Sequence, residues 1–102
     1  MTQQITIVVP IKAKTEKRAE VRRRLQDLAA QTHREPGNIN YILHEVPSQP
    51  DLFLIYENWK DQAALDFHME QDYLKQFLAD WPLLLTEEVR GTICRLMEDD
   101  VK

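Results

Sequence analysis

The chain has 102 residues, of which 43% are apolar and 29% are charged, a balance that is ordinary for a globular protein. Its net charge of −4 argues against a general nucleic-acid binder, and its two glycines leave no Gly-rich loop for a nucleotide. No apolar run approaches the roughly 20 residues that a membrane-spanning helix needs. We therefore expect one domain over residues 1–102, with a core from about 5 to 97 and no membrane partner.

The cysteine and histidine content bears on compartment and metal binding. The first twelve residues lack the charged region and cleavage site of a signal peptide, and the single Cys94 cannot form an internal disulfide. Both features predict the cytoplasm, with Cys94 as inert packing in a strand. The histidines at 33, 44 and 68 have no i,i+4 pairing and no cysteine cluster nearby, so no metal site is predicted.

Seven of the thirteen basic residues lie between Lys12 and Arg24. Such a cluster is either a patch for an anionic partner or a solvated helix face. Glu16 and Glu20 are interleaved with the basic residues at helical spacing, which favours the solvated face with ion pairs along it.

The first half of the chain predicts a strand and a helix. Residues 4–12 alternate apolar and other side chains with the period of a strand, in which Pro10 should lie at an edge or a bulge. Thr15 is the expected N-cap of the next helix, which the Pro36-Gly37 pair ends. Its apolar stripe recurs at spacings of four, three and four: Val21, Leu25, Leu28 and Thr32.

The second half predicts a hairpin, a broken helix and a last strand. Residues 39–46 and 52–59 alternate as strands, and the short turn between them makes the pair antiparallel. Asp61 should cap a helix that breaks near Gln71, and Asp72 should cap a second piece that Pro82 stops. Residues 88–97 alternate as a final strand.

The element order is thus β-α-β-β-α-β, which predicts an α+β, ferredoxin-like sandwich. A four-stranded antiparallel sheet would carry both helices on one face. Because the first and third strands are apolar on both faces, the other sheet face should also be covered. A face-to-face homodimer would bury it.

Three segments resemble the antibiotic biosynthesis monooxygenase domain family: EPGNINYILHE, LFLIYENWKDQAALDFH and YLKQF. The resemblance runs from about Ile5 to Leu96. The positions that match the family's pattern are Glu35, Pro36, Gly37, Tyr41, Glu57, Trp59, Asp61 and His68. The chain departs from it at Gln71-Asp72-Tyr73, where many relatives carry a second histidine. Residues 70–82 also lack the histidine that haem-degrading relatives need, so haem degradation is not expected.

The resemblance implies a monooxygenase that needs no cofactor and oxidises a small aromatic or quinol-type molecule with O2. A deprotonated hydroquinone can pass an electron to O2, so the protein must bind the substrate, remove a proton and exclude water. The alternative is a dimeric module of the same fold that binds or isomerises a small metabolite without oxygenase activity.

His68 and Glu57 are the candidate catalytic residues. His68 lies on the inward stripe of its helix, where it is either a general base or a core histidine with one hydrogen bond. Glu57 either tunes a histidine or forms a salt bridge, with Arg90 or Arg95 of the last strand or with an arginine of a partner subunit.

The candidate substrate-binding residues are Trp59, Tyr41, His44, Asn58 and Tyr73. Trp59 is either a pocket wall or a large core residue, and Tyr73 could donate a hydrogen bond where relatives have an imidazole. His44 lies on the strand face opposite Tyr41, so the two should not share one pocket. Asn58 shares the opposite face of its own strand with Tyr56, where the alternative role is in the dimer interface.

Overall fold

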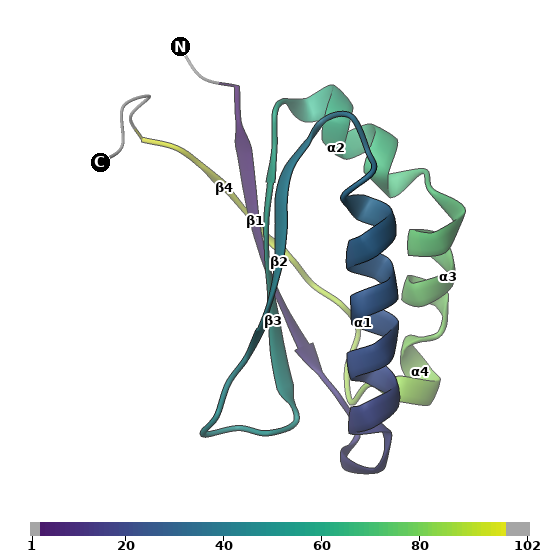
Figure 1. The fold of residues 1–102 in the computed structure, drawn as a ribbon. Coiled ribbons are helices and arrows are strands. Elements are labelled where there is room, and N and C mark those ends of the chain that lie inside the picture. The colour runs from purple at the N-terminus through teal and green to yellow at the C-terminus, as the bar shows by residue number, and fades with distance from the viewer. Residues whose placement is uncertain (1–2, 98–102) are drawn as a thin grey trace.

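A four-stranded antiparallel sheet carries the helices on one of its faces (Figure 1). The structure, a computed structural model, describes residues 3–97. The predicted order is confirmed, and the sheet has the ferredoxin-like strand order β2-β3-β1-β4. Its elements are β1 (Ile5–Lys12), a 3-10 turn η1 (Thr15–Lys17), α1 (Arg18–Thr32), β2 (Asn38–Glu45), β3 (Leu52–Trp59), α2 (Gln62–Met69), α3 (Asp72–Ala79), α4 (Trp81–Leu84) and β4 (Thr92–Arg95).

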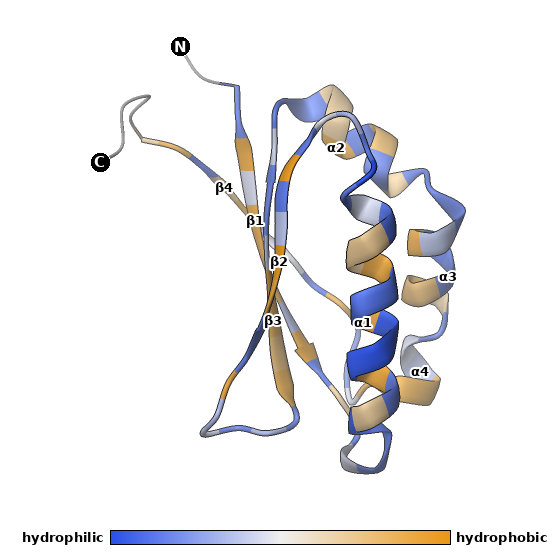
Figure 2. Cartoon of the chain, in the orientation of Figure 1, coloured by the Kyte–Doolittle hydropathy of each residue, from blue (hydrophilic) through white to orange (hydrophobic). Residues whose placement is uncertain are grey.

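The core lies between the helices and the sheet face that they cover. Alternate residues of β1 and β3 point into it, and the predicted stripe of α1 meets them from the other side. Figure 2 shows a strongly hydrophilic band across α1, while apolar residues recur along the rest of the helix. Pro10 has only β3 beside it, because β4 pairs with β1 no further than Val8, so its predicted edge position is confirmed.

The start of α1 differs from the prediction. Thr15 does not cap the helix, which is preceded by the 3-10 turn η1 and has no side-chain cap. The Thr15 hydroxyl instead donates to Asp51 Oδ2 at 2.7 Å, and Arg18 pairs with the same carboxylate at 2.8 Å. A tertiary contact with the β2–β3 turn therefore replaces the local cap.

Three further boundaries test the predictions for the second half. Asp61 caps α2 as predicted, since its side chain accepts a hydrogen bond from the Ala64 amide at 2.9 Å. Asp72 is the first residue of α3 rather than its cap, and Gln71 occupies the cap position. Pro82 does not stop the helix. It lies in the first turn of α4, where the missing amide hydrogen costs nothing.

The last strand is shorter than its alternating pattern predicts. β4 covers only Thr92–Arg95, the residues that pair with Ile5 to Val8 of β1. Residues 88–91 have the same alternating pattern but are not in a strand. An alternating sequence forms a strand only where a neighbouring strand is present to pair with it.

The basic cluster is a solvated and paired surface, as the interleaved acids suggested. Lys17 pairs with Glu20 along the helix, but the other partners come from elsewhere in the chain. Four such pairs join Lys12 to Glu87, Arg18 to Asp51, Arg22 to Glu45 and Arg24 to Asp80. These pairs are partly exposed, so each contributes little to stability.

The sheet face away from the helices is open in the described chain. Ile42 is 44% exposed and Tyr56 41% exposed, although both lie in strands. Cys94 is also exposed on β4, so its predicted packing role is wrong for the isolated chain. Within residues 3–97, no helix has the length and apolar character that a bilayer crossing requires.

A close backbone approach holds the turn after α1 against α2. A methyl group built on Gly37 would lie 2.2 Å from Ala64 Cβ and 3.3 Å from Ala64 Cα, well inside normal contact. The Gly37 carbonyl also accepts a hydrogen bond from the Lys60 amide at 3.0 Å, just before α2 begins. Glycine is required here because α2 packs directly on the turn.

We predict that Gly37→Ala lowers the free energy of unfolding by about 1–3 kcal/mol, because the added methyl group pushes α2 away from the turn. Chemical denaturation monitored by circular dichroism measures the change. Gly91→Ala is the matched control. Its methyl group would meet side-chain methyl groups of Ile7 at 2.9 Å and Val9 at 3.2 Å, a less severe overlap than the 2.2 Å contact with Ala64, so it should cost less. Equal effects of the two substitutions would contradict the special role of Gly37.

Candidate active site

A cavity of about 400 Å³ lies between the sheet and the helices α2 and α3. Residues of four strands and helices, β1, β3, α2 and α3, line most of it, with Leu28 of α1, Ile93 of β4 and residues just before β4, and most of these residues are apolar. Four polar side chains also face it: Glu57, Gln62, Asp66 and His68. The volume is within the range of small-molecule sites, and an apolar wall with few polar groups is their usual character.

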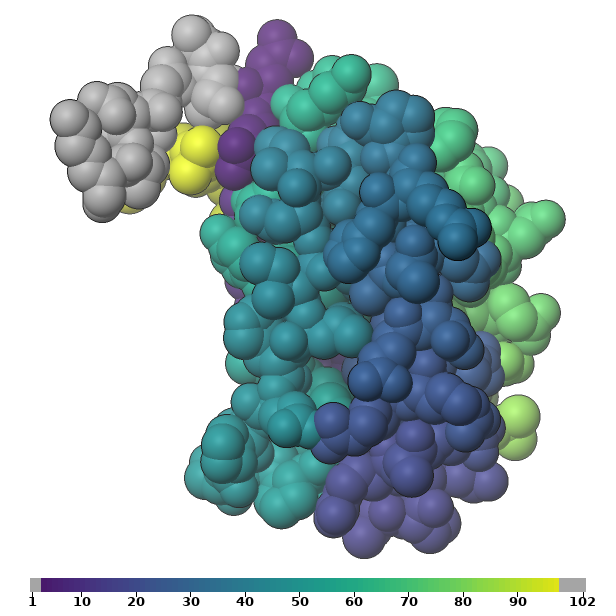
Figure 3. Space-filling model, viewed as in Figure 1, coloured from purple at the N-terminus to yellow at the C-terminus, as the bar shows by residue number. Residues whose placement is uncertain are grey.

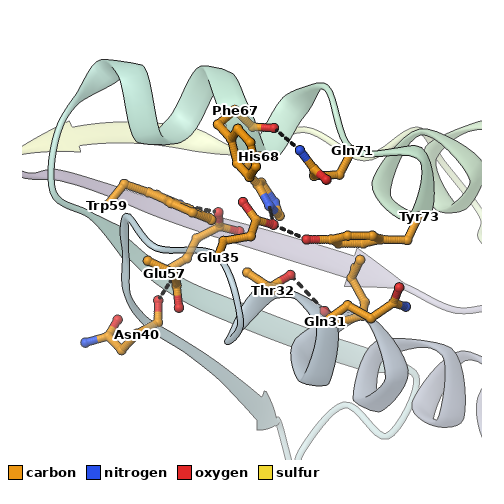
Figure 4. Close-up of polar contacts among 12 residues, drawn as sticks. Gln31, Thr32, Glu35, Asn40, Glu57, Trp59, Phe67, His68, Gln71 and Tyr73 are labelled. Carbon is orange, nitrogen blue, oxygen red and sulfur yellow. Dashed lines mark hydrogen bonds and ion pairs between the residues drawn. The ribbon is translucent and has the colours of Figure 1, made fainter.

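His68 is held in this wall by a carboxylate behind it. Its ring is 2% exposed, and Nδ1 lies 2.8 Å from Glu35 Oε2 (Figure 4). An imidazole nitrogen and a carboxylate oxygen this close must be joined by a hydrogen bond. When the ring is neutral and the acid is ionised, the proton of that bond is on Nδ1. Within residues 3–97 the ring's other nitrogen, Nε2, makes no hydrogen bond, so it remains available to a molecule in the cavity.

Glu35 lies in the turn after α1 and is buried, at 7% exposed. Its Oε2 accepts a second hydrogen bond from the Tyr73 hydroxyl, which α3 brings to it. Its Oε1 is buried and has no partner among the described residues. Burial of the phenol, with the bond to Glu35 as a smaller cause, raises the pKa of Tyr73, so this hydroxyl stays protonated and remains a donor.

Two aromatic rings pack around His68 on the sheet side. Trp59 is fully buried at the end of β3, with its ring centroid 4.4 Å from that of His68, and Tyr41 of β2 lies 6.0 Å away. Burial, with the charges of Glu57 and Glu35 as smaller causes, raises the pKa of Tyr41. These rings fix the plane of the imidazole, which Figure 4 shows between Trp59 and Tyr73.

Glu57 is the second acid of the site, and it faces the cavity itself. Its Oε1 accepts a hydrogen bond from Trp59 Nε1 at 2.8 Å. Burial, reinforced by the negative charge of Glu35 and opposed by the Trp59 bond, raises the pKa of Glu57 to about 7. The carboxyl group can therefore be neutral or ionised near neutral pH, which is what proton transfer requires.

Glu57 forms no salt bridge within the described part of the chain. Arg90 and Arg95, its predicted partners, are both exposed, and neither is ion-paired with it. The predicted pairing within one chain is wrong because β4 begins only at Thr92 and lies next to β1, one strand away from Glu57. Without a cation beside it, burial dominates the protonation of this acid.

The structure separates the predicted site residues into three groups. His68 and Glu57 line the cavity, whereas Trp59, Tyr41 and Tyr73 contact them or Glu35 from behind and do not line it. His44 and Asn58 are elsewhere. The first lines a separate hollow between α1 and the hairpin strands, on the side of the molecule that Figure 3 shows.

Asn58 is buried in a polar cluster near the edge of the open sheet face. Its Oδ1 accepts hydrogen bonds from Thr6 and Gln4, and its Nδ2 donates to Asn40 Oδ1 at 2.9 Å. The side chain thus has partners on both of its polar ends. It has a structural role between strands, and its predicted contact with substrate has no support from its position.

Sequence reasoning did not select Glu35 as a site residue. An acid before Pro-Gly in a turn is normally solvated, and its partner His68 is 33 residues away. The signal that could have found it is the family pattern itself, which includes this acid. Among residues 3–97 no group of three or more histidine, cysteine or acidic side chains is arranged to hold a metal ion.

Comparisons with known proteins agree with this architecture. The family model for "Antibiotic biosynthesis monooxygenase" matches residues 4–80. The protein named "Putative monooxygenase YcnE" of Bacillus subtilis is 37% identical over 82 residues, which cover 80% of this chain and 86% of that protein. The protein sll1783 of Synechocystis is 31% identical over 94 residues, or 92% of this chain, but the chain spans only 64% of that relative.

A solved structure, PA3566 from Pseudomonas aeruginosa, has the same fold with a TM-score of 0.87 and 26% identity, covering 96% of this chain and 98% of its own. The matched residues include the turn with Glu35, the end of β3 with Glu57, and His68 on α2. The chain belongs to the antibiotic biosynthesis monooxygenase family.

Proposed function

We propose that this protein is a monooxygenase that needs no cofactor and oxidises a small aromatic or quinol-type molecule with O2 in the cavity beneath α2. The observation that supports this most is that one largely apolar cavity is lined by both His68 of α2, whose Nε2 has no hydrogen bond among the described residues, and Glu57 of β3, which titrates near neutral pH. The family name and the name of the Bacillus relative support a monooxygenase-like role.

The reaction balances without an added reductant. A hydroquinone and one O2 give a hydroxyquinone and one water, so the substrate supplies all four electrons. His68 Nε2 takes the proton of a substrate hydroxyl, and the resulting anion passes an electron to O2. The two radicals then combine to form a carbon–oxygen bond, and loss of water leaves the quinone. The apolar walls exclude water from the intermediate.

The residues that line the cavity favour an uncharged substrate. Its walls are apolar, and neither lysine nor arginine is among the lining residues. Glu57 and Asp66 would repel a carboxylated or phosphorylated molecule. A flat phenol with its hydroxyl at His68 buries its ring against the apolar side chains, and neutral Glu57 can donate to a second substrate oxygen.

We predict that the purified, metal-stripped protein consumes O2 with uncharged hydroquinones and naphthols faster than they autoxidise. His68→Ala should lower kcat by about 10²–10⁴-fold, the usual contribution of a general base. An oxygen electrode measures the rate, and the product is identified as a hydroxyquinone or quinone. His33→Ala, which removes an exposed histidine outside the cavity, is the matched control. Full activity in His68→Ala would exclude the assigned base.

The second candidate function is a dimeric module that binds or isomerises a small metabolite. A histidine and a carboxyl group with a pKa of about 7 on one wall could also move a proton between two carbons of a carbonyl compound. The same electrode experiment separates the two functions. Ligand-dependent thermal stabilisation without O2 uptake across the substrate panel would favour this second function.

The raised pKa of Glu57 predicts a pH-dependent stability. The folded protein binds the Glu57 proton up to about pH 7, whereas the unfolded chain releases it near the ordinary value of 4.5. Between these values the folded state binds more protons, so its stability decreases as pH rises and stays reduced above pH 7.

We predict that Glu57→Gln, which keeps an acceptor for Trp59, is more stable than wild type above pH 7 by about 3 kcal/mol. The difference should shrink towards zero below about pH 4.5. Thermal or urea unfolding across this pH range measures it. Glu70→Gln, a change at an exposed carboxylate, should show no such trend. A constant difference at every pH would contradict the buried, titrating acid.

We also propose that the protein is a homodimer that pairs the open sheet faces of two chains. Relatives of this family often form dimers. The open face presents Ile42 and Tyr56 from the middle of β2 and β3, and exposed apolar strand residues in a contiguous sheet mark an interface. A second copy is the occupant whose surface has the same flat, apolar shape.

We predict that sedimentation gives twice the mass of one chain, and that Tyr56→Asp shifts the equilibrium to the monomer by placing a charge in the interface. Phe67→Asp is the matched control, because Phe67 is similarly exposed but belongs to α2 in the helix layer. A monomeric wild-type protein, or dissociation by the Phe67 substitution alone, would contradict the proposed interface.

A further inference from the structure

Among the described residues, Glu35 has the one buried side-chain oxygen without a hydrogen-bond partner. Glu35 does not line the cavity. Both of its hydrogen bonds converge on Oε2, one from His68 Nδ1 and one from the Tyr73 hydroxyl, while Oε1 is buried without a partner. A buried carboxylate with one unsatisfied oxygen is destabilising. Apolar residues would fill this position at less cost, so the arrangement calls for a reason other than stability.

We propose that Glu35 is a positioning residue: it holds the proton of His68 on Nδ1, so that the unprotonated Nε2 is the nitrogen that meets a molecule in the cavity. This inference rests on the proposed function of His68 as a base. The carboxylate accepts but cannot donate, so the ring can bond to it only through a protonated nitrogen. Without Glu35 the proton could move to Nε2, where the ring can no longer take one.

The negative charge of Glu35 has a second effect on the same step. When His68 takes the substrate proton, the ring becomes a cation in a buried site. The ionised Glu35, 2.8 Å away, offsets that charge, as a carboxylate behind a histidine does in other acid–base sites. Since Glu35 is on the opposite side of the ring from the cavity, it stabilises the cation without repelling the substrate anion at close range.

Tyr73 completes the arrangement by orienting the carboxylate. Its hydroxyl donates to the same oxygen as His68, which fixes the rotation of the carboxyl group. The phenol, whose pKa is raised, keeps its proton, so toward a carboxylate oxygen of Glu35 it acts as the donor.

The tautomer of His68 can be measured directly. Heteronuclear NMR of isotopically labelled protein distinguishes the protonated from the unprotonated ring nitrogen in each histidine. His33 is an internal reference of the opposite kind, because its Nε2 lies 2.9 Å from the Tyr41 carbonyl and must donate to it. We expect the Nδ1–H form for His68 and the Nε2–H form for His33 in the same spectrum, without substrate or O2.

Substitutions of Glu35 separate its two effects. Glu35→Leu removes the acceptor, so the Nε2–H form of His68 should appear and kcat should fall by about 10- to 100-fold with KM near the wild-type value. Glu35→Gln keeps an acceptor oxygen but loses the charge, so it should retain the Nδ1–H form and still lower kcat. Glu45→Gln, at an exposed carboxylate that pairs with Arg22, is the control with unchanged tautomer and rate.

The Nε2–H form of His68 in the wild-type protein would overturn the proposal, as would an unchanged tautomer and rate in Glu35→Leu. The wild-type spectrum tests the proposed tautomer of His68 even if Glu35→Leu fails to fold. It also separates this proposal from the proposed function: a wild-type protein that shows the Nδ1–H form but consumes no O2 retains the positioning role of Glu35 and loses the oxygenase.

Discussion

The contact between the Pro36-Gly37 turn and α2 is the constraint on which the site depends. The helix can rest on the turn only because Gly37 has no side chain to meet Ala64. One turn of helix further along, the same contact places His68 beside Glu35. A loop residue and a helix residue 33 positions apart become a bonded pair through this packing. The contact of His68 with Glu35 and its packing against Trp59 both follow from where α2 lies.

Two carboxyl groups in this small core have different environments, and the difference assigns their roles. Glu35 receives two donors on one oxygen and lies behind the histidine. Glu57 receives one bond from Trp59 and faces an apolar cavity, so burial raises its pKa to about 7. A carboxyl group that titrates near neutral pH beside a cavity is characteristic of sites that move protons. Glu35 therefore holds the imidazole, whereas Glu57 can exchange a proton with a molecule in the cavity.

The two faces of the sheet have different roles in the fold. The face under the helices holds the core and the cavity, and the strand period sends Tyr41, Glu57 and Trp59 to it. The same period sends His44, Tyr56 and Asn58 to the other face or its edge, away from His68. Alternation in a strand therefore shows which residues can share a site, and equally which residues cannot.

Periodicity and local capping signals were sufficient for the elements of this chain, because they reflect geometry within a few residues. The strand 52–59 and the cap at Asp61 were predicted from such patterns. The failures lie where a distant partner intervenes. Thr15 bonds to Asp51 instead of capping α1, and β4 is only as long as the part of β1 that pairs with it.

For the site, the sequence by itself determined that His68 points inward and that Glu57 shares a strand face with apolar residues. Both follow from helical and strand periods. Only the tertiary structure decided that Glu35 contacts His68, that Trp59 packs behind the ring rather than lining the cavity, and that no arginine within residues 3–97 pairs with Glu57. The physical reason is range: a period fixes the direction of a side chain from its own backbone, whereas its partner is fixed by how separate elements pack.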